Sequence, residues 1–123
     1  MNCFDCHYYL YLNGHRLTVE GNASVGKTSN NAYIYIQKGE FICDGNVTLN
    51  NVGYLTCLCM QNDEDYVSIG GNLLCQNSSS MSSGFMKAGT LEIKGDFTQE
   101  KTGRANNFVC SGTHKVILSG EKA

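Results

Sequence analysis

Three segments of the chain carry residue types at spacings that known chemistry uses. Cys3, Cys6 and His7 fit the C-x-x-C-H pattern of covalent haem attachment and would also supply half of a zinc site. Residues 21–28 (GNASVGKT) fit the G-x-x-x-x-G-K-[ST] pattern of a phosphate-binding loop. Residues 62–65 (NDED) bring together carboxylates of the kind that bind calcium. Whether each pattern can carry out this chemistry depends on the secondary-structure elements around it.

Those elements argue against a cofactor or a metal in all three segments. Haem attachment needs export, and Cys57 and Cys59 are too close in sequence to complete a usual zinc site. A phosphate loop must lie between a strand and a helix, whereas residues 32–36 are strand-like. The acidic run lacks the glycine and the spaced carboxylates of a calcium loop, which favours a solvated turn. We therefore expect no catalytic residue, no cofactor and no metal.

A repeat of strand-like phrases organises the whole chain. Five apolar phrases each end in a glycine, and these glycines recur at a nearly constant spacing of about 25 residues. Four of the glycines precede Asn or Asp, and the series is Gly21-Asn22, Gly45-Asn46, Gly71-Asn72, Gly95-Asp96 and finally Gly120. Repeats of this length indicate a solenoid in which each unit buries its apolar face against its neighbours.

Each unit contains up to three alternating apolar pairs, enough for three short strands joined by bends. The sequence therefore predicts an all-β, single-domain parallel β-solenoid over residues 1–123. We expect four to five coils of about 25 residues, ending near the five glycines, and a right-handed winding.

The Gly-Asn column is predicted to form the turns of the solenoid. Glycine tolerates positive φ, and asparagine tolerates the left-handed region while its amide bonds to the backbone. Identical amides one coil apart are expected to form a hydrogen-bonded ladder.

Several phrases resemble repeats of clostridial and related gut-bacterial surface proteins. They are residues 11–22 (YLNGHRLTVEGN), 88–99 (AGTLEIKGDFTQ) and 111–120 (SGTHKVILSG), together with residues 60–62 and 65–67. The resemblance covers most of the chain. It implies a repetitive, non-catalytic shaft or adhesion region without catalytic residues.

Four tyrosines are predicted to share one outer face. Tyr9 and Tyr11 recur one repeat later as Tyr33 and Tyr35, and Cys57 and Cys59 take the same places in the following repeat. They alternate with inward apolar residues, so they should point outward as a stacked patch of the kind enriched in protein interfaces. The alternative is ordinary cross-strand aromatic pairing that stabilises the sheet.

Amino-acid composition limits which kinds of partner and which cellular compartment we expect for this chain. A net charge of −2 gives no basic field for direct nucleic-acid binding, and no apolar stretch is long enough to span a bilayer. The seven cysteines are an odd number, which favours a reducing compartment over a disulfide scaffold. Without a leader, this chain is expected in the cytoplasm, or at the cell surface if it is excised from a longer exported protein.

The function we expect is a non-catalytic binding or structural module that acts through protein–protein contact. The partner is an unidentified protein, or a second copy held through the open ends of the solenoid or the tyrosine face. An alternative is a stand-alone intracellular inhibitor from a mobile element, of the anti-CRISPR or anti-restriction type. A fragment of a carbohydrate-active enzyme is a more distant alternative, because no cluster of carboxylates falls on one face.

Overall fold

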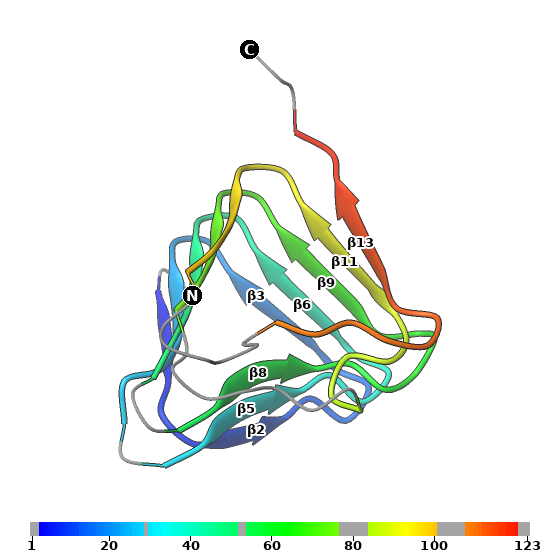
Figure 1. The fold of residues 1–123 in the computed structure, drawn as a ribbon, viewed down its shortest axis with the longest axis horizontal. Helices are drawn as coiled ribbons and strands as arrows, with labels where there is room; N and C mark the ends of the chain where they lie inside the picture. Colours follow the sequence, from blue (N-terminus) through cyan, green and yellow to red (C-terminus); the bar gives the residue numbers. More distant parts are fainter. Residues whose placement is uncertain (1–2, 29, 52–53, 77–83, 101–107, 121–123) are drawn as a thin grey trace.

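Short parallel strands wind around three sides of a triangular prism (Figure 1). A computed structural model describes residues 3–28, 30–51, 54–76, 84–100 and 108–120. Within these residues the chain contains strands and turns but no helix. The architecture is the predicted β-solenoid, with about four turns of roughly 24 residues each. The right-handed winding stays a prediction.

Each side of the prism is one parallel sheet. Sheet A consists of β1 (Phe4–Cys6), β4 (Ala23–Gly26), β7 (Val47–Asn50), β10 (Leu73–Cys75) and β12 (Phe97–Gln99). Sheet B consists of β2 (Tyr9–Tyr11), β5 (Ala32–Tyr35) and β8 (Thr56–Cys59). Sheet C consists of β3 (Arg16–Val19), β6 (Glu40–Cys43), β9 (Tyr66–Ile69), β11 (Thr90–Ile93) and β13 (Lys115–Leu118).

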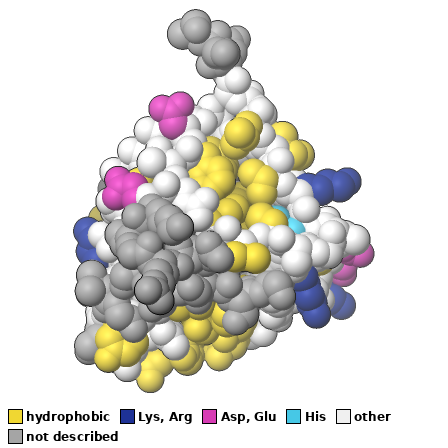
Figure 2. Space-filling view, in the orientation of Figure 1, with side chains coloured by type: hydrophobic (Ala, Val, Ile, Leu, Met, Phe, Trp, Pro, Cys, Tyr) yellow, Lys and Arg dark blue, Asp and Glu magenta, His cyan; other side chains and the backbone are white. Residues whose placement is uncertain are grey.

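The apolar residues predicted to point inward form one continuous core. Ile34, Phe41 and Leu73, one from each sheet, are all fully buried. Burial fades toward the C-terminal coil, where Leu118 is 64% exposed although it lies in register with the buried Ile93. A coil is covered from both sides only when it has a neighbour on each side, and β13 has a neighbouring strand on one side only. Figure 2 shows apolar side chains gathered at this end of the prism.

The glycine column lies at the corner between sheets C and A, but it works differently from the prediction. Positive φ does not occur at any of its glycines, nor at the Asn and Asp residues that follow them. Among the described residues positive φ occurs elsewhere, for example at Gly14 and Gly89 in the turns between sheets B and C. The predicted left-handed turn at Gly21, Gly45 and Gly71 is therefore wrong.

Close approach of the backbone between coils explains these glycines instead. Gly45 N–H donates to the Gly21 carbonyl at 3.0 Å, and Gly71 and Gly95 repeat this bond at 2.8 Å, each to the glycine one coil earlier. A Cβ atom on Gly45, Gly71 or Gly95 would collide with that carbonyl group. Glycine is needed here because any side chain would push the stacked coils apart.

The Asn residues form a ladder, but it runs from side chain to backbone. Asn22 Oδ1 accepts the N–H of Asn46 at 2.9 Å, and Asn46 Oδ1 accepts the N–H of Asn72 at 2.8 Å. Asn72 Oδ1 then accepts the N–H of Asp96 at 2.7 Å. The predicted amide-to-amide bonding is thus replaced by a bond that satisfies a backbone donor at each corner.

Asp65 links two coils at the corner between sheets B and C. Its carboxylate is 1% exposed and accepts the backbone N–H of Lys38 at 2.6 Å and of Gln61 at 2.9 Å. It also accepts the N–H of Asn62 at 3.2 Å. The expectation of a solvated turn at residues 62–65 is therefore wrong for Asp65, whose charge is balanced by backbone donors from its own turn and from the previous coil.

Replacement of Gly71 by alanine tests the close approach at the corner. The new methyl group would collide with Asn46 Oδ1 and the Gly45 carbonyl, so we expect a loss of about 1–3 kcal/mol in the free energy of unfolding. Gly84→Ala is the matched control, because its Cβ would meet no atom within 4 Å. Urea denaturation of the two variants checks this. Equal stability of both variants would contradict the steric explanation.

Candidate binding surface

The structure brings the four predicted tyrosines together on the outside of sheet B. We call Tyr9, Tyr11, Tyr33 and Tyr35 the tyrosine face. Tyr9 lies in register with Tyr33, and Tyr11 with Tyr35. The rings of Tyr11 and Tyr35 are stacked with centroids 4.6 Å apart and an interplanar angle of 1°, and those of Tyr9 and Tyr33 are 5.2 Å apart at 19°. Parallel register in the sheet thus produces two aromatic stacks side by side.

Exposure divides the tyrosine face into two parts. Tyr9 is 42% and Tyr11 50% exposed, Tyr35 is half-buried, and Tyr33 is only 8% exposed. Tyr33 is covered in part by the ring of Phe85, whose centroid lies 5.2 Å away. The stacking covers only those ring faces of Tyr9 and Tyr11 that meet Tyr33 and Tyr35, because β2 is the edge strand of sheet B. The accessible part of the face is therefore centred on β2.

Tyr8 extends this accessible part, and sequence reasoning missed it. It is 60% exposed, and its ring packs edge-on against Tyr9 with centroids 5.0 Å apart. Tyr8 lies in the bend before β2, where strand alternation does not define a direction. Figure 2 shows hydrophobic side chains along the lower side of the molecule, which is the side that sheet B occupies in Figure 1.

Cys57 and Cys59 continue the two columns but do not belong to the accessible surface. They lie in register with Tyr33 and Tyr35 and are 0% and 2% exposed. Their Sγ atoms are in direct contact, 2.7 Å apart. Burial raises the pKa of the Cys57 thiol well above its ordinary value, and the contact with Cys59 adds to this effect. The Cys57 thiol therefore stays neutral.

The phenol groups of the inner tyrosines are also kept neutral. Burial raises the pKa of Tyr33 and of Tyr35 from 10.0 to about 12, and the neighbouring thiol and phenol groups reinforce the shift. At physiological pH both hydroxyl groups therefore remain hydrogen-bond donors as well as acceptors.

The structure separates the residues of the C-x-x-C-H segment. Cys3 is exposed, whereas Cys6 is 6% exposed and its Sγ–H donates to the Tyr8 carbonyl at 3.3 Å. His7 Nδ1 forms a hydrogen bond of 2.9 Å with the Gly26 carbonyl, so this ring nitrogen already has a partner. The three side chains therefore do not converge on one position.

The phosphate-loop match belongs to the solenoid. Ala23–Gly26 form strand β4, and the next described element is strand β5 rather than a helix. The N–H of Lys27 donates to the Asn50 carbonyl at 2.7 Å, and that of Thr28 to Asn51 Oδ1 at 3.3 Å. These amides already have partners and do not form a phosphate cradle.

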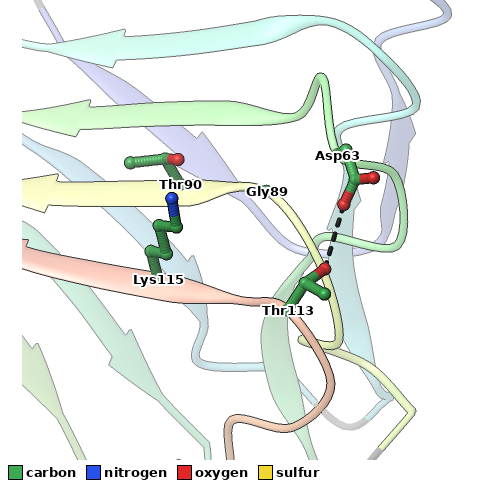
Figure 3. Close-up of a pocket in the computed structure, with 5 residues that line it drawn as sticks. All are labelled: Asp63, Gly89, Thr90, Thr113 and Lys115. Atoms are coloured by element: carbon green, nitrogen blue, oxygen red, sulfur yellow. Dashed lines mark hydrogen bonds between the residues drawn. The ribbon is translucent and has the colours of Figure 1, made fainter.

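A concave site that sequence reasoning missed lies at the corner between sheets B and C (Figure 3). We call it the corner cavity. It has a volume of about 340 Å³ and is lined by Asp63, Gly89, Thr90, Thr113 and Lys115. Thr113 Oγ1 donates to Asp63 Oδ1 at 2.9 Å across one side of it. One feature of the sequence could have indicated this site. The interval from Gly45 to Gly71 is longer than the interval from Gly21 to Gly45, which indicates a longer turn in the third coil.

Comparisons with protein-family models, with curated proteins and with solved structures found no match. The class of protein is therefore defined by the structure alone, as a parallel β-solenoid built from repeats. The resemblance to gut-bacterial surface repeats stays a prediction from the sequence. None of the described residues forms a helix long and apolar enough to cross a membrane.

The raised pKa values of Tyr33 and Tyr35 predict a fall in stability at alkaline pH. The unfolded chain releases these phenol protons near pH 10.0, while the folded protein retains them until about pH 12. Their contribution to stability is therefore complete below pH 10 and is lost as the pH rises toward 12. Urea denaturation across this range measures the fall, and Tyr33→Phe and Tyr35→Phe should each reduce it. An unchanged pH dependence in both variants would contradict the assignment.

The two cysteines of the N-terminal segment should react at different rates with a thiol reagent. Cys3 is exposed, while Cys6 is buried and burial raises the pKa of its thiol. We expect Cys3→Ser to lower the amplitude of the fast phase of the reaction with Ellman's reagent in the native protein, while the exposed Cys110 supplies the rest of that phase. Cys6→Ser should leave the fast phase unchanged and remove a thiol that reacts only after denaturation. Fast reaction of Cys6 would disprove its inward placement.

Proposed function

We propose that this β-solenoid is a non-catalytic module that binds another protein through its tyrosine face. The single observation that carries the proposal is the exposure of Tyr9 and Tyr11 side by side on β2, extended by Tyr8. Large aromatic side chains supply much of the binding energy in protein interfaces because they bury apolar area and retain a polar group. A rigid sheet holds them in place, so little conformational entropy is lost on binding.

The chemistry of the face favours a partner recognised without charge. Its four side chains are phenols, and the two inner ones stay neutral up to about pH 12. Aromatic rings and hydroxyl groups suit contact with apolar groups and with backbone carbonyls of a protein surface. Binding through this face should therefore depend only weakly on salt, unlike an interface built on ion pairs.

The repeated coils support a more specific proposal, in which the solenoid is a spacer or adhesion element of a surface protein. Parallel stacking makes the prism a stiff shaft that carries the tyrosine face at a constant position. The resemblance of residues 11–22, 88–99 and 111–120 to gut-bacterial surface repeats points the same way. A second copy of the chain is the alternative partner for the face.

Substitution of Tyr9 and Tyr11 by threonine tests the proposal, since threonine keeps a high preference for strands. Immobilised wild-type protein and the double variant are compared by quantitative mass spectrometry of the proteins that each retains from a lysate. The matched control is Ile117→Thr, because Ile117 is 44% exposed and lies on another sheet. We expect at least one protein to be retained by the wild type and by the control. The double variant should retain at least about tenfold less of that protein.

Light scattering of the same three proteins tests the alternative partner. If the partner is a second copy, the wild type and the Ile117→Thr variant should be dimers and the tyrosine variant a monomer. Retention of the same proteins by all three, together with an unchanged mass in solution, would overturn the proposed function. Thermal unfolding verifies that each variant is folded.

A further inference from the structure

We propose that the corner cavity binds a small zwitterion, a molecule with both an ammonium and a carboxylate group, such as a free amino acid. The cavity lies at the corner between sheets B and C and does not include the tyrosine face. The inference is therefore independent of the proposed function, and each can fail without the other.

The cavity exists because the turn of the fourth coil is shorter than the turn of the third coil. In the third coil residues 61–65 connect Met60 to Tyr66, whereas in the fourth only residues 87–89 connect the paired positions Met86 and Thr90. The shorter turn is recessed, and the Thr113–Asp63 hydrogen bond joins the coils on either side of it. Gly89, with φ +82°, lines the recess, and a side chain there would collide with Asp65.

Two opposite charges line this recess without neutralising each other. Asp63 and Lys115 both line the cavity, but they form no ion pair in the part of the chain that the structure describes. Figure 3 shows the ammonium group of Lys115 beside the side chain of Thr90, and Asp63 on the other side of Gly89. The hydrogen bond from Thr113 holds the Asp63 carboxylate in position. A ligand with one positive and one negative end would pair with both charges at once.

Other ligand classes match this lining less well. A phosphate or another dianion would meet one ammonium group and a repelling carboxylate. Among the described residues no three His, Cys, Asp or Glu side chains gather as a metal ion would require. None of the described residues that line the cavity has a large apolar or aromatic side chain, which disfavours an apolar ligand or a sugar stacked on a ring. The hydroxyl group of Thr90 adds a donor and acceptor that suits the polar ends of a zwitterion.

Titration of the protein with glycine, followed by NMR chemical shifts, tests the proposal. Acetate and methylammonium are the controls, because each carries only one of the two charged groups. We expect glycine to bind with a dissociation constant of about 1 mM or below, and each single-ended control to bind at least about tenfold more weakly. Absence of glycine binding, or acetate binding as tight as that of glycine, would overturn the proposal.

Two charge-removing variants locate the binding. Asp63→Asn and Lys115→Gln should each weaken glycine binding at least about tenfold, since each removes the partner of one ligand charge. The matched controls are Asp44→Asn and Lys94→Gln, which make the same changes of charge at exposed positions outside the cavity. Equal glycine affinity in the cavity variants and the controls would place the binding elsewhere and reject the site.

Discussion

The hydrogen bonds from the N–H groups of Gly45, Gly71 and Gly95, each to the carbonyl of the glycine one coil earlier, set the arrangement of the solenoid. They leave no room for a Cβ atom at Gly45, Gly71 or Gly95, so a change of residue at any of them separates the coils. The Asn side chains beside the glycines accept the next backbone N–H in the column and hold the same register. With this corner aligned, the strands of all three sheets pair with their equivalents in the next coil.

Alignment of the coils has different consequences inside and outside the prism. Inside, equivalent apolar residues stack, and their burial supplies the main driving force for folding. Outside, equivalent residues form columns, so a tyrosine repeated at the same place in the next coil becomes a stacked ring pair. Surface chemistry on this scaffold is therefore determined column by column, while the core requires only that each coil contribute apolar side chains.

The corners between sheets B and C accept changes in length that the glycine corner does not. The longer turn at residues 61–65 leaves the register of β9 with β6 and β11 intact. The buried carboxylate of Asp65 fastens this longer turn to the previous coil through backbone donors. The difference in turn length also produces the recess in which Asp63 and Lys115 face a common space. Variation in turn length is thus a source of distinct surface sites on a regular core.

The sequence alone determined the fold class, the coil length and the inward residues, because period-two alternation and a fixed repeat are local properties of the chain. It also placed Tyr9, Tyr11, Tyr33 and Tyr35 on one face, since equal spacing implies equal position in stacked coils.

Only the tertiary structure decided the burial and the contacts of individual residues. It showed that the glycines serve close approach rather than positive φ, that Phe85 covers Tyr33 while Tyr11 stays exposed, and that Asp65 is buried. It also brought Asp63 to Thr113, which lies two coils further along the chain. These outcomes depend on atoms from different coils meeting in space, and a local pattern does not contain that information.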